Sequence, residues 1–399
     1  MPASGTSGPP LERLPGAKAI VRAPTLSHGF AARRPPLPYS PGALPTLAKD
    51  RSEVVRATLW GALAAAVVVA GIYFGSRGLK DFDTALVPYA GATIFAAFGL
   101  GYRYVMWLQR PPTRMYWVRG WQIFLEPSRL PANLVFFVRR LFANFVAQSF
   151  IARRGAARWA AHWLIFWGCV LAALVTFPLS FGWIRFETVP HSQQTYQAFV
   201  FGLPVFRFPL ASPIAPLVFN VLDIAAVLVL AGIAFAFWRR ARDRGALAVQ
   251  QLSSDLMPLF LLFSICVTGL LLTVSTHAAR GYHYGFLSEF HAVTVIFTLL
   301  YLPFGKFFHI FQRPAQLSIE FYRRASAEGP QAACARCGRE FAGRLHVEDL
   351  KKVEDGLGIK FGTAAVHYQD VCPVCRRKLL AITQDGLWRE HGRPRPEGP

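Results

Sequence analysis

The sequence predicts an all-α integral membrane protein, a bundle of about six transmembrane helices followed by a small polar domain. Of the 399 residues, 53% are hydrophobic and only 16% are charged, whereas about a quarter of a soluble domain is charged. Apolar runs of about 20 residues recur along the chain, which is the length that a helix needs to cross a bilayer. The Lys and Arg residues behind the net charge of +21 cluster between these runs, so the charge indicates membrane orientation and no nucleic-acid partner.

Six segments have the length and apolarity of membrane spans. They are Ala57–Gly75, Thr84–Tyr102, Trp159–Ile184, Ile214–Trp238, Leu256–Ala279 and Gly285–Phe311. A seventh segment, Ala132–Ala152, carries Arg139 and Arg140 at its centre, where each charge costs about 2.5–3.5 kcal/mol to insert. We therefore expect it to lie in the membrane interface as an amphipathic helix.

The distribution of arginines predicts the orientation of the bundle. Ten arginines lie between residues 103 and 158, and four more follow the fourth span at residues 239–244. Loops rich in Lys and Arg stay in the cytoplasm. Both termini are therefore expected on the cytoplasmic side of the cytoplasmic (inner) membrane.

Composition divides the chain into four regions. Residues 1–50 are rich in Pro, Gly and Ala with scattered Arg, and we interpret them as a disordered cytoplasmic tail. Residues 51–130 hold two helices and a basic loop. Residues 131–325 hold the interfacial segment and a core of four spans, and residues 326–399 form a polar cytoplasmic domain.

Four histidines lie in or at the ends of the predicted spans, where ionisable residues are candidates for function. His291 and His309 are 18 residues apart, about five helical turns, so a continuous helix would carry both on one face about 27 Å apart. The helix directions put His162 level with His309 at the inner surface and His277 level with His291 at the outer surface. Each pair could hold a haem iron between two imidazoles, although each residue alone could equally be an interfacial histidine bonded to a neighbour.

These residues carry a family resemblance. The segment PFGKFFHIFQRP (303–314), the spacing of His291 and His309, and the segment RWAAHWLIFWG (158–168) resemble the gamma subunit of respiratory nitrate reductases, a di-haem cytochrome b, and its relatives in heterodisulfide- and sulfite-reductase-type complexes. The resemblance covers roughly residues 130–325.

The resemblance implies two stacked haems b, oxidation of quinol near the outer one, and transfer of electrons to cytoplasmic iron–sulfur and molybdopterin subunits. His162 and His309 would hold the inner haem, and His291 one side of the outer haem. The family's second ligand to the outer haem falls near Ala172 in this sequence. His277 would replace it, or the chain would bind one haem and His291 would serve the quinone.

A quinol site also needs a base, because oxidation of quinol releases protons. Asp223 is the one carboxylate well inside a predicted span, and it is our candidate, with a hydrogen bond between helices as the alternative. Arg280 and Lys306 lie near the outer and inner histidines and are candidate partners of haem propionates. An interfacial position and snorkelling are the simpler explanations of these two cations.

The polar domain contains two CxxC pairs, which predict a metal site in a reducing compartment. Their thiolates suit a tetrahedral ion and belong to Cys334, Cys337, Cys372 and Cys375. The pattern favours a zinc-ribbon-like structural site. The alternative is a rubredoxin-like iron, against which Arg376 stands where rubredoxins have Gly.

The sequence thus predicts an electron-transfer subunit that draws on the quinone pool and leaves the terminal chemistry to its partners. The alternative is a multi-pass small-solute transporter with a cytoplasmic zinc-binding domain. A transporter needs charges along a membrane path, and the spans offer chiefly Asp223.

Overall fold

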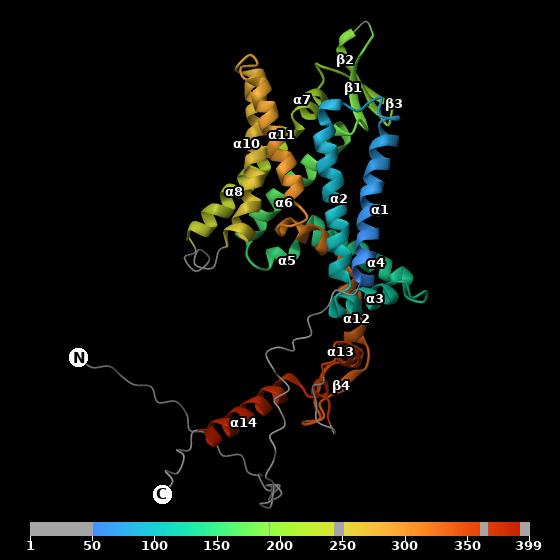
Figure 1. Ribbon diagram of the computed structural model, residues 1–399, viewed down its shortest axis with the longest axis vertical. Coiled ribbons are helices and arrows are strands. Elements are labelled where there is room, and N and C mark those ends of the chain that lie inside the picture. Colours follow the sequence, from blue (N-terminus) through green and yellow to red (C-terminus); the bar gives the residue numbers. More distant parts are fainter. Residues whose placement is uncertain (1–50, 191, 243–250, 360–365, 392–399) are drawn as a thin grey trace, which may run out of the picture. The chain divides into compact units, whose positions relative to one another are not determined.

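The computed structural model describes residues 51–190, 192–242, 251–359 and 366–391, and these are mostly helical (Figure 1). The tail predicted over residues 1–50 lies outside the described residues. Six of the described helices are long and apolar enough to cross a membrane, as the sequence predicts. They are α1 (Arg51–Gly75), α2 (Val87–Leu108, after the 3₁₀ turn Thr84–Leu86), α6 (Ala156–Ser180), α8 (Val221–Arg242), α10 (Met257–His277) and α11 (Tyr284–Tyr301).

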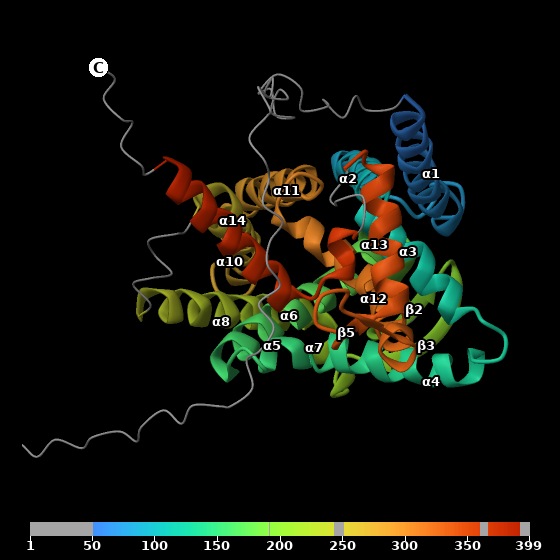
Figure 2. The same cartoon turned by 90° about the horizontal axis from the view of Figure 1, so that it is seen from below.

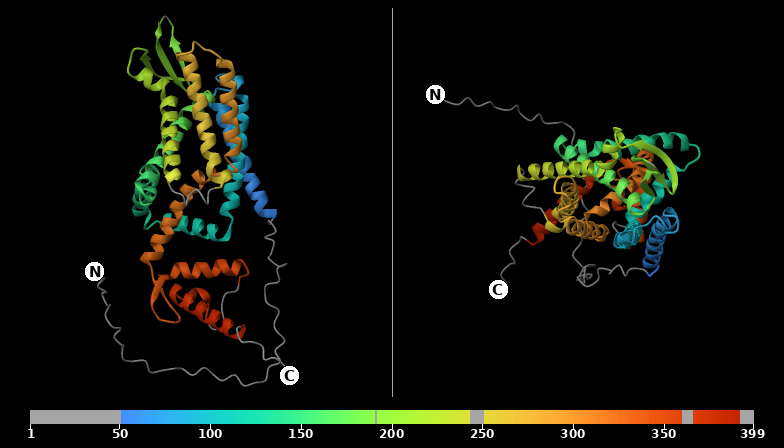
Figure 3. Two further views of the ribbon diagram at one scale, coloured as in Figure 1. Left: turned by 90° about the vertical axis from the view of Figure 1, so that its left-hand side faces the viewer. Right: turned by 90° about the horizontal axis from the view of Figure 1, so that it is seen from above.

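These six helices form one bundle. α1 packs against α2, α2 against α11, α11 against α10, α10 against α8 and α8 against α6. The views along and across the bundle show them running lengthwise beside one another (Figure 3). Large apolar side chains remain exposed along their outer faces, as expected where lipid covers them.

Further helices flank the bundle. They are α3 (Pro111–Phe124), α4 (Leu130–Leu141), the π-helical turn η2 (Phe142–Val146), α5 (Ser149–Ala152), α7 (Ile214–Phe219) and α12 (His309–Glu328). The amphipathic helix expected over 132–152 is therefore broken. Gln148, which adopts left-handed backbone angles (φ 51°, ψ 40°), separates η2 from α5.

Small residues allow a close helix contact between α6 and α8. A Cβ atom on Gly168 would lie 2.6 Å from Val229 and 2.8 Å from the Ala225 carbonyl oxygen. Gly232 makes the reciprocal approach to Ile165 on α6. Close backbone approach at small residues is the usual way in which helices pack within a membrane.

The last predicted span is wrong in its extent. The helix expected over 285–311 ends at Tyr301, and α12 starts anew at His309. Pro303 and Gly305 lie in the break, and proline and glycine disfavour a continuous helix. The Arg103 side chain of α2 donates hydrogen bonds to the Pro303 and Gly305 carbonyls. Because of the break, His291 and His309 do not share a face of one helix.

An antiparallel sheet lies between α6 and α7 and corrects the all-α prediction. Its strands are β1 (Ile184–Val189), β2 (Ser192–Val200) and β3 (Leu203–Pro209), in that order. Arg185 of β1 and Arg77 both bind Asp81, which ties the sheet to the turn that follows α1. The span expected over 214–238 is divided at Asn220 into α7 and α8.

The C-terminal region contains the hairpin β4 (Gln331–Ala333) and β5 (Glu340–Gly343), then α13 (Arg344–Gly356) and α14 (Pro373–His391). α13 packs against α3 and α12, which lie beside it in Figure 2. Asp349 of α13 is 2% exposed. It accepts hydrogen bonds from Arg119 of α3 (3.1 Å) and Tyr322 of α12 (3.2 Å).

Candidate functional site

A cavity of about 1210 Å³ opens between α1 and α2 on one side and α6 and α12 on the other. Its volume exceeds the roughly 300–1,000 Å³ of most small-molecule sites. His162 and His309 both line it, together with apolar side chains such as Phe166 and Leu63. The structure therefore brings together the two histidines that the sequence pairs at the inner surface.

The His162 ring is fixed by a buried amide. Its Nδ1 atom lies 2.8 Å from Oε1 of Gln148, which is 2% exposed. An amide oxygen only accepts hydrogen bonds, so Nδ1 carries the hydrogen and Nε2 keeps its lone pair. Nε2 makes no hydrogen bond to any residue that the structure describes.

The His309 ring is the same tautomer, with its hydrogen on Nδ1. Its Nδ1 atom lies 2.5 Å from the Lys306 carbonyl oxygen, which again can only accept. Burial lowers the pKa of His309 below its ordinary value, which favours a neutral imidazole. Each ring therefore offers a free Nε2 lone pair beside one cavity, and a hydrogen bond at Nδ1 is what orients histidines that bind metals.

Cations lie at the polar side of the cavity. Arg154 and Arg313 both line it, and the Arg313 guanidinium lies 4.8 Å from the centre of the Phe150 ring. Burial lowers the pKa of Arg313. Lys306, the predicted partner of a propionate, instead forms an ion pair with Asp255 (2.5 Å). Its carbonyl oxygen, rather than its ammonium group, takes part in the site.

His277 and His291 do not form the second pair that we predicted. His291 Nδ1 lies 2.8 Å from the Thr268 hydroxyl of α10, and Thr268 is nine residues before His277, about 13 Å along the helix. His277 is exposed, and its Nδ1 lies 3.0 Å from the Thr273 carbonyl oxygen. The two rings are therefore at different depths in the bundle.

Asp223 and Arg280 lie toward the end of the bundle at which α8 begins and α10 ends. Asp223, in the first turn of α8, accepts a hydrogen bond from the Thr273 hydroxyl (2.8 Å) and is half-buried. This contact joins α8 to α10, as the alternative interpretation of Asp223 expects. Arg280 is exposed, with a left-handed φ of 50°, in the turn between α10 and α11. The predicted base and the predicted cation are thus both remote from the cavity.

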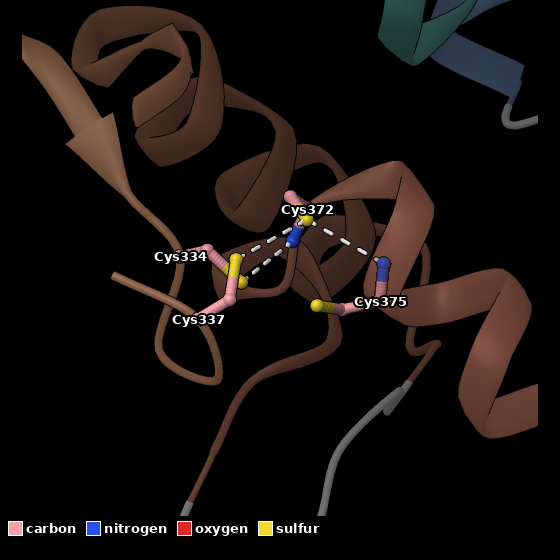
Figure 4. Close-up of side chains that lie close together, drawn as sticks. All are labelled: Cys334, Cys337, Cys372 and Cys375. Carbon is pink, nitrogen blue, oxygen red and sulfur yellow. Dashed lines mark hydrogen bonds between the residues drawn. The ribbon is translucent and has the colours of Figure 1, made fainter. Parts of the chain in front are cut away.

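The four cysteines of the polar domain converge. Their Sγ atoms all lie within 4.8 Å of one another, and those of Cys337 and Cys372 are 3.9 Å apart. A tetrahedral zinc site with Zn–S distances of about 2.3 Å separates its sulfurs by about 3.8 Å. Figure 4 shows the four side chains turned toward a common centre. The arrangement can bind a metal ion.

Backbone amides support this cluster. The amide of Cys372 donates to the Cys334 sulfur (3.2 Å), and the amide of Cys375 donates to the Cys372 sulfur (3.4 Å). The first of these bonds is the largest of several contacts that lower the pKa of Cys334 to about 6, which favours the thiolate that metals bind. Arg376 lies within α14, where the backbone does not need the Gly that rubredoxins have at this position.

Sequence reasoning missed three residues of the cavity. Arg313 could have been found, because it follows His309 by one helical turn and shares its face. Arg154 is one of the ten arginines between residues 103 and 158, and its place in that basic segment does not point to a ligand site. Gln148 carries no local signal, since only the folded chain brings it to His162.

Comparison with known proteins adds no further information. No protein-family model, curated protein or solved structure matches the chain.

Proposed function

We propose that this protein is the membrane cytochrome b subunit of an oxidoreductase complex, which oxidises quinol and passes electrons to a cytoplasmic partner. The observation that carries the proposal is the convergence of His162 and His309 on one cavity, each with Nδ1 hydrogen-bonded and Nε2 free. His162 and His309 would hold the iron of a haem b through Nε2, and a haem held by two histidines would suit electron transfer. Bound there, haem b supplies a reversible one-electron centre.

The other residues of the cavity fit the rest of that cofactor. Apolar side chains of α1 and α2, including Leu63, Val67 and Leu100, offer a lipid-like wall for the macrocycle. Arg154 and Arg313 offer guanidinium groups that pair well with carboxylates such as propionates. Pairing with an anion also offsets the desolvation that lowers the pKa of Arg313.

We place the quinol toward the end of the bundle that carries Asp223 and His291. Ala225 of α8 lies against Gly168 of α6, six residues after His162, so Asp223 is at least about 9 Å further along the bundle than His162. His291 lies five residues, about 7.5 Å, from the level of the Asp223–Thr273 bond. Asp223, the proposed proton acceptor, is therefore separated along the bundle from the cavity that would hold the haem.

Partner subunits and a metal ion complete the proposed complex. Iron–sulfur and molybdopterin subunits would receive the electrons on the cytoplasmic side, where the basic loops and both termini are expected. The four cysteines would hold a structural zinc ion, because such a site stabilises a small domain. The ion would fix the start of α14, which lies within the second CxxC pair. No described group of cysteines other than this one could hold a metal cluster.

The test is reduction of bound haem by quinol. The purified protein is reconstituted in vesicles, a reduced quinone analogue is added, and the haem absorption band is followed over time. We expect rapid reduction in the wild type and a rate about 100-fold lower in Asp223→Asn, because a positioned base contributes at least that factor. Glu289→Gln, which removes an exposed carboxylate of α11, is the matched control. A haem that dithionite reduces and quinol does not would contradict the quinol role.

A further inference from the structure

Gln148 is the most unusual polar residue of the cavity. It is 2% exposed, lines the cavity wall and adopts a left-handed backbone conformation that is uncommon for any residue except Gly. Its Oε1 atom accepts from His162. Its Nε2 atom is buried and has no hydrogen-bond partner among the described residues, although buried amides are almost always fully bonded.

The fold holds Gln148 in place from α6. The indole Nε1 of Trp159 donates to the Ala147 carbonyl (2.8 Å), and that of Trp163 donates to the Val146 carbonyl (3.3 Å). Residues 159, 162 and 163 lie on one face of the helix, so two indoles and one imidazole hold residues 146–148 together. This support explains why the left-handed conformation persists, and it makes the distance between Gln148 and His162 a property of the fold.

We infer that Gln148 is a positioning residue with two contacts, in which Oε1 orients His162 and Nε2 donates a hydrogen bond to a carboxylate of the ligand in the cavity. The inference deepens the proposed function and rests on it. Arg154 and Arg313 line the same cavity and attract an anion, and the Glu320 carboxylate that also lines it is already paired with Arg140 (2.8 Å). An amide donor there recognises the ligand carboxylate without adding charge, and the contact satisfies the buried Nε2 group of Gln148, which has no partner among the described residues.

The Oε1 contact predicts an electronic effect on bound iron. A hydrogen bond accepted from Nδ1–H makes the imidazole a stronger donor at Nε2, which stabilises the ferric state. Removing the acceptor therefore raises the midpoint potential, and a stronger acceptor lowers it. A tenfold change in the preference for ferric over ferrous iron corresponds to about 59 mV for one electron.

The experiment compares Gln148→Leu and Gln148→Glu with the wild type by haem titration of the apoprotein, redox titration and the low-spin electron paramagnetic resonance spectrum. We expect Gln148→Leu to bind haem about 10–100-fold more weakly and to shift the potential upward by about 59 mV. Gln148→Glu should shift the potential downward, since the carboxylate accepts from His162 more strongly. Gln109→Leu, which removes a half-buried amide at the end of α2, controls for the general loss of a glutamine.

Each outcome separates the two proposals. If the wild type binds no haem, the proposed function fails. If the wild type binds haem through His162 and His309 but Gln148→Leu matches its affinity, potential and spectrum, only the inference about Gln148 is overturned. Shifts of the midpoint potential in the same direction in both variants would likewise contradict it. Such a result would show that the potential does not follow the acceptor strength of residue 148, as expected if the residue were purely structural.

Discussion

Hydrogen bonds at single residues decide what the cavity can bind. Both histidines that line it use Nδ1 within the protein, one toward the Gln148 amide and one toward the Lys306 carbonyl. The tautomer with a free Nε2 is therefore set before any ligand enters, which lowers the cost of binding. A histidine that donated its hydrogen bond from Nε2 would have no lone pair at Nε2 and could not bind iron through that atom.

The ion pair of Lys306 and Asp255 gives the first prediction. The hydrogen bond from Lys306 lowers the pKa of Asp255, so the pair stabilises the fold above the ordinary carboxyl pKa and is lost as pH falls through the lowered value. Lys306→Met should remove this part of the acid sensitivity below about pH 4. Because Lys306 is 55% exposed, the change is less than about 1 kcal/mol. Unfolding midpoints measured from pH 7 to pH 3 test it, and parallel curves for the two proteins would contradict it.

The four-cysteine cluster gives the second prediction. Cys334→Ser removes one of four converging sulfurs, so the bound metal should fall from about one ion per chain to nearly none. The C-terminal region should then become sensitive to protease, because such sites stabilise small domains. Cys169→Ala, in a membrane span, is the control. Metal analysis of the purified proteins decides, and an unchanged metal content in Cys334→Ser would contradict the site.

At the scale of elements, close packing of α6 on α8 positions His162. Gly168→Ala should destabilise the bundle by about 1–3 kcal/mol, because the new methyl group meets Val229 and the Ala225 carbonyl. Gly91→Ala is the matched control, since a Cβ atom there meets nothing within 4 Å and Ala favours a helix over Gly. Thermal unfolding in detergent should show a lower midpoint only for Gly168→Ala. Equal midpoints for the two variants would show that this contact is unimportant.

The sequence predicts these elements unevenly. Apolar runs identify the six candidate spans among the described residues, because the length and apolarity that a helix needs in lipid are local properties of the sequence. The break at Pro303 and Gly305 was missed, since the apolar pattern continues through it and the Arg103 side chain that binds its carbonyls is 200 residues away. Strands β1–β3 were missed because pairing between strands, rather than any single run, defines them.

The candidate site was predicted only where it depends on local sequence patterns. Histidine pairing at the inner surface follows from helix order, and the cysteine pairs follow from their spacing. The pairing of His277 with His291 failed, because α10 and α11 align Thr268, rather than His277, with His291. Gln148 and the cavity itself arise only when four segments distant in sequence meet.

At the scale of the whole molecule, the proposal connects three depths of one bundle. Asp223 and Thr273 lie toward one end. His291 of α11 lies level with Thr268, about 7.5 Å from Thr273 along α10, and His162 and His309 line the cavity toward the other end. The arrangement suits a path from a proton-releasing donor to a cytoplasmic partner. We expect His162 and His309 to hold one haem at this cavity.

The most direct measurement is the reduced-minus-oxidised absorption spectrum, with haem content per chain, of the wild type and single variants from haem-replete cells. His283→Asn, in an exposed turn whose left-handed backbone Asn tolerates, is the control and should match the wild type. We predict a low-spin spectrum in the wild type and loss of the same haem from His162→Ala and from His309→Ala. A folded wild type without haem, or full haem content in both variants, would contradict the account.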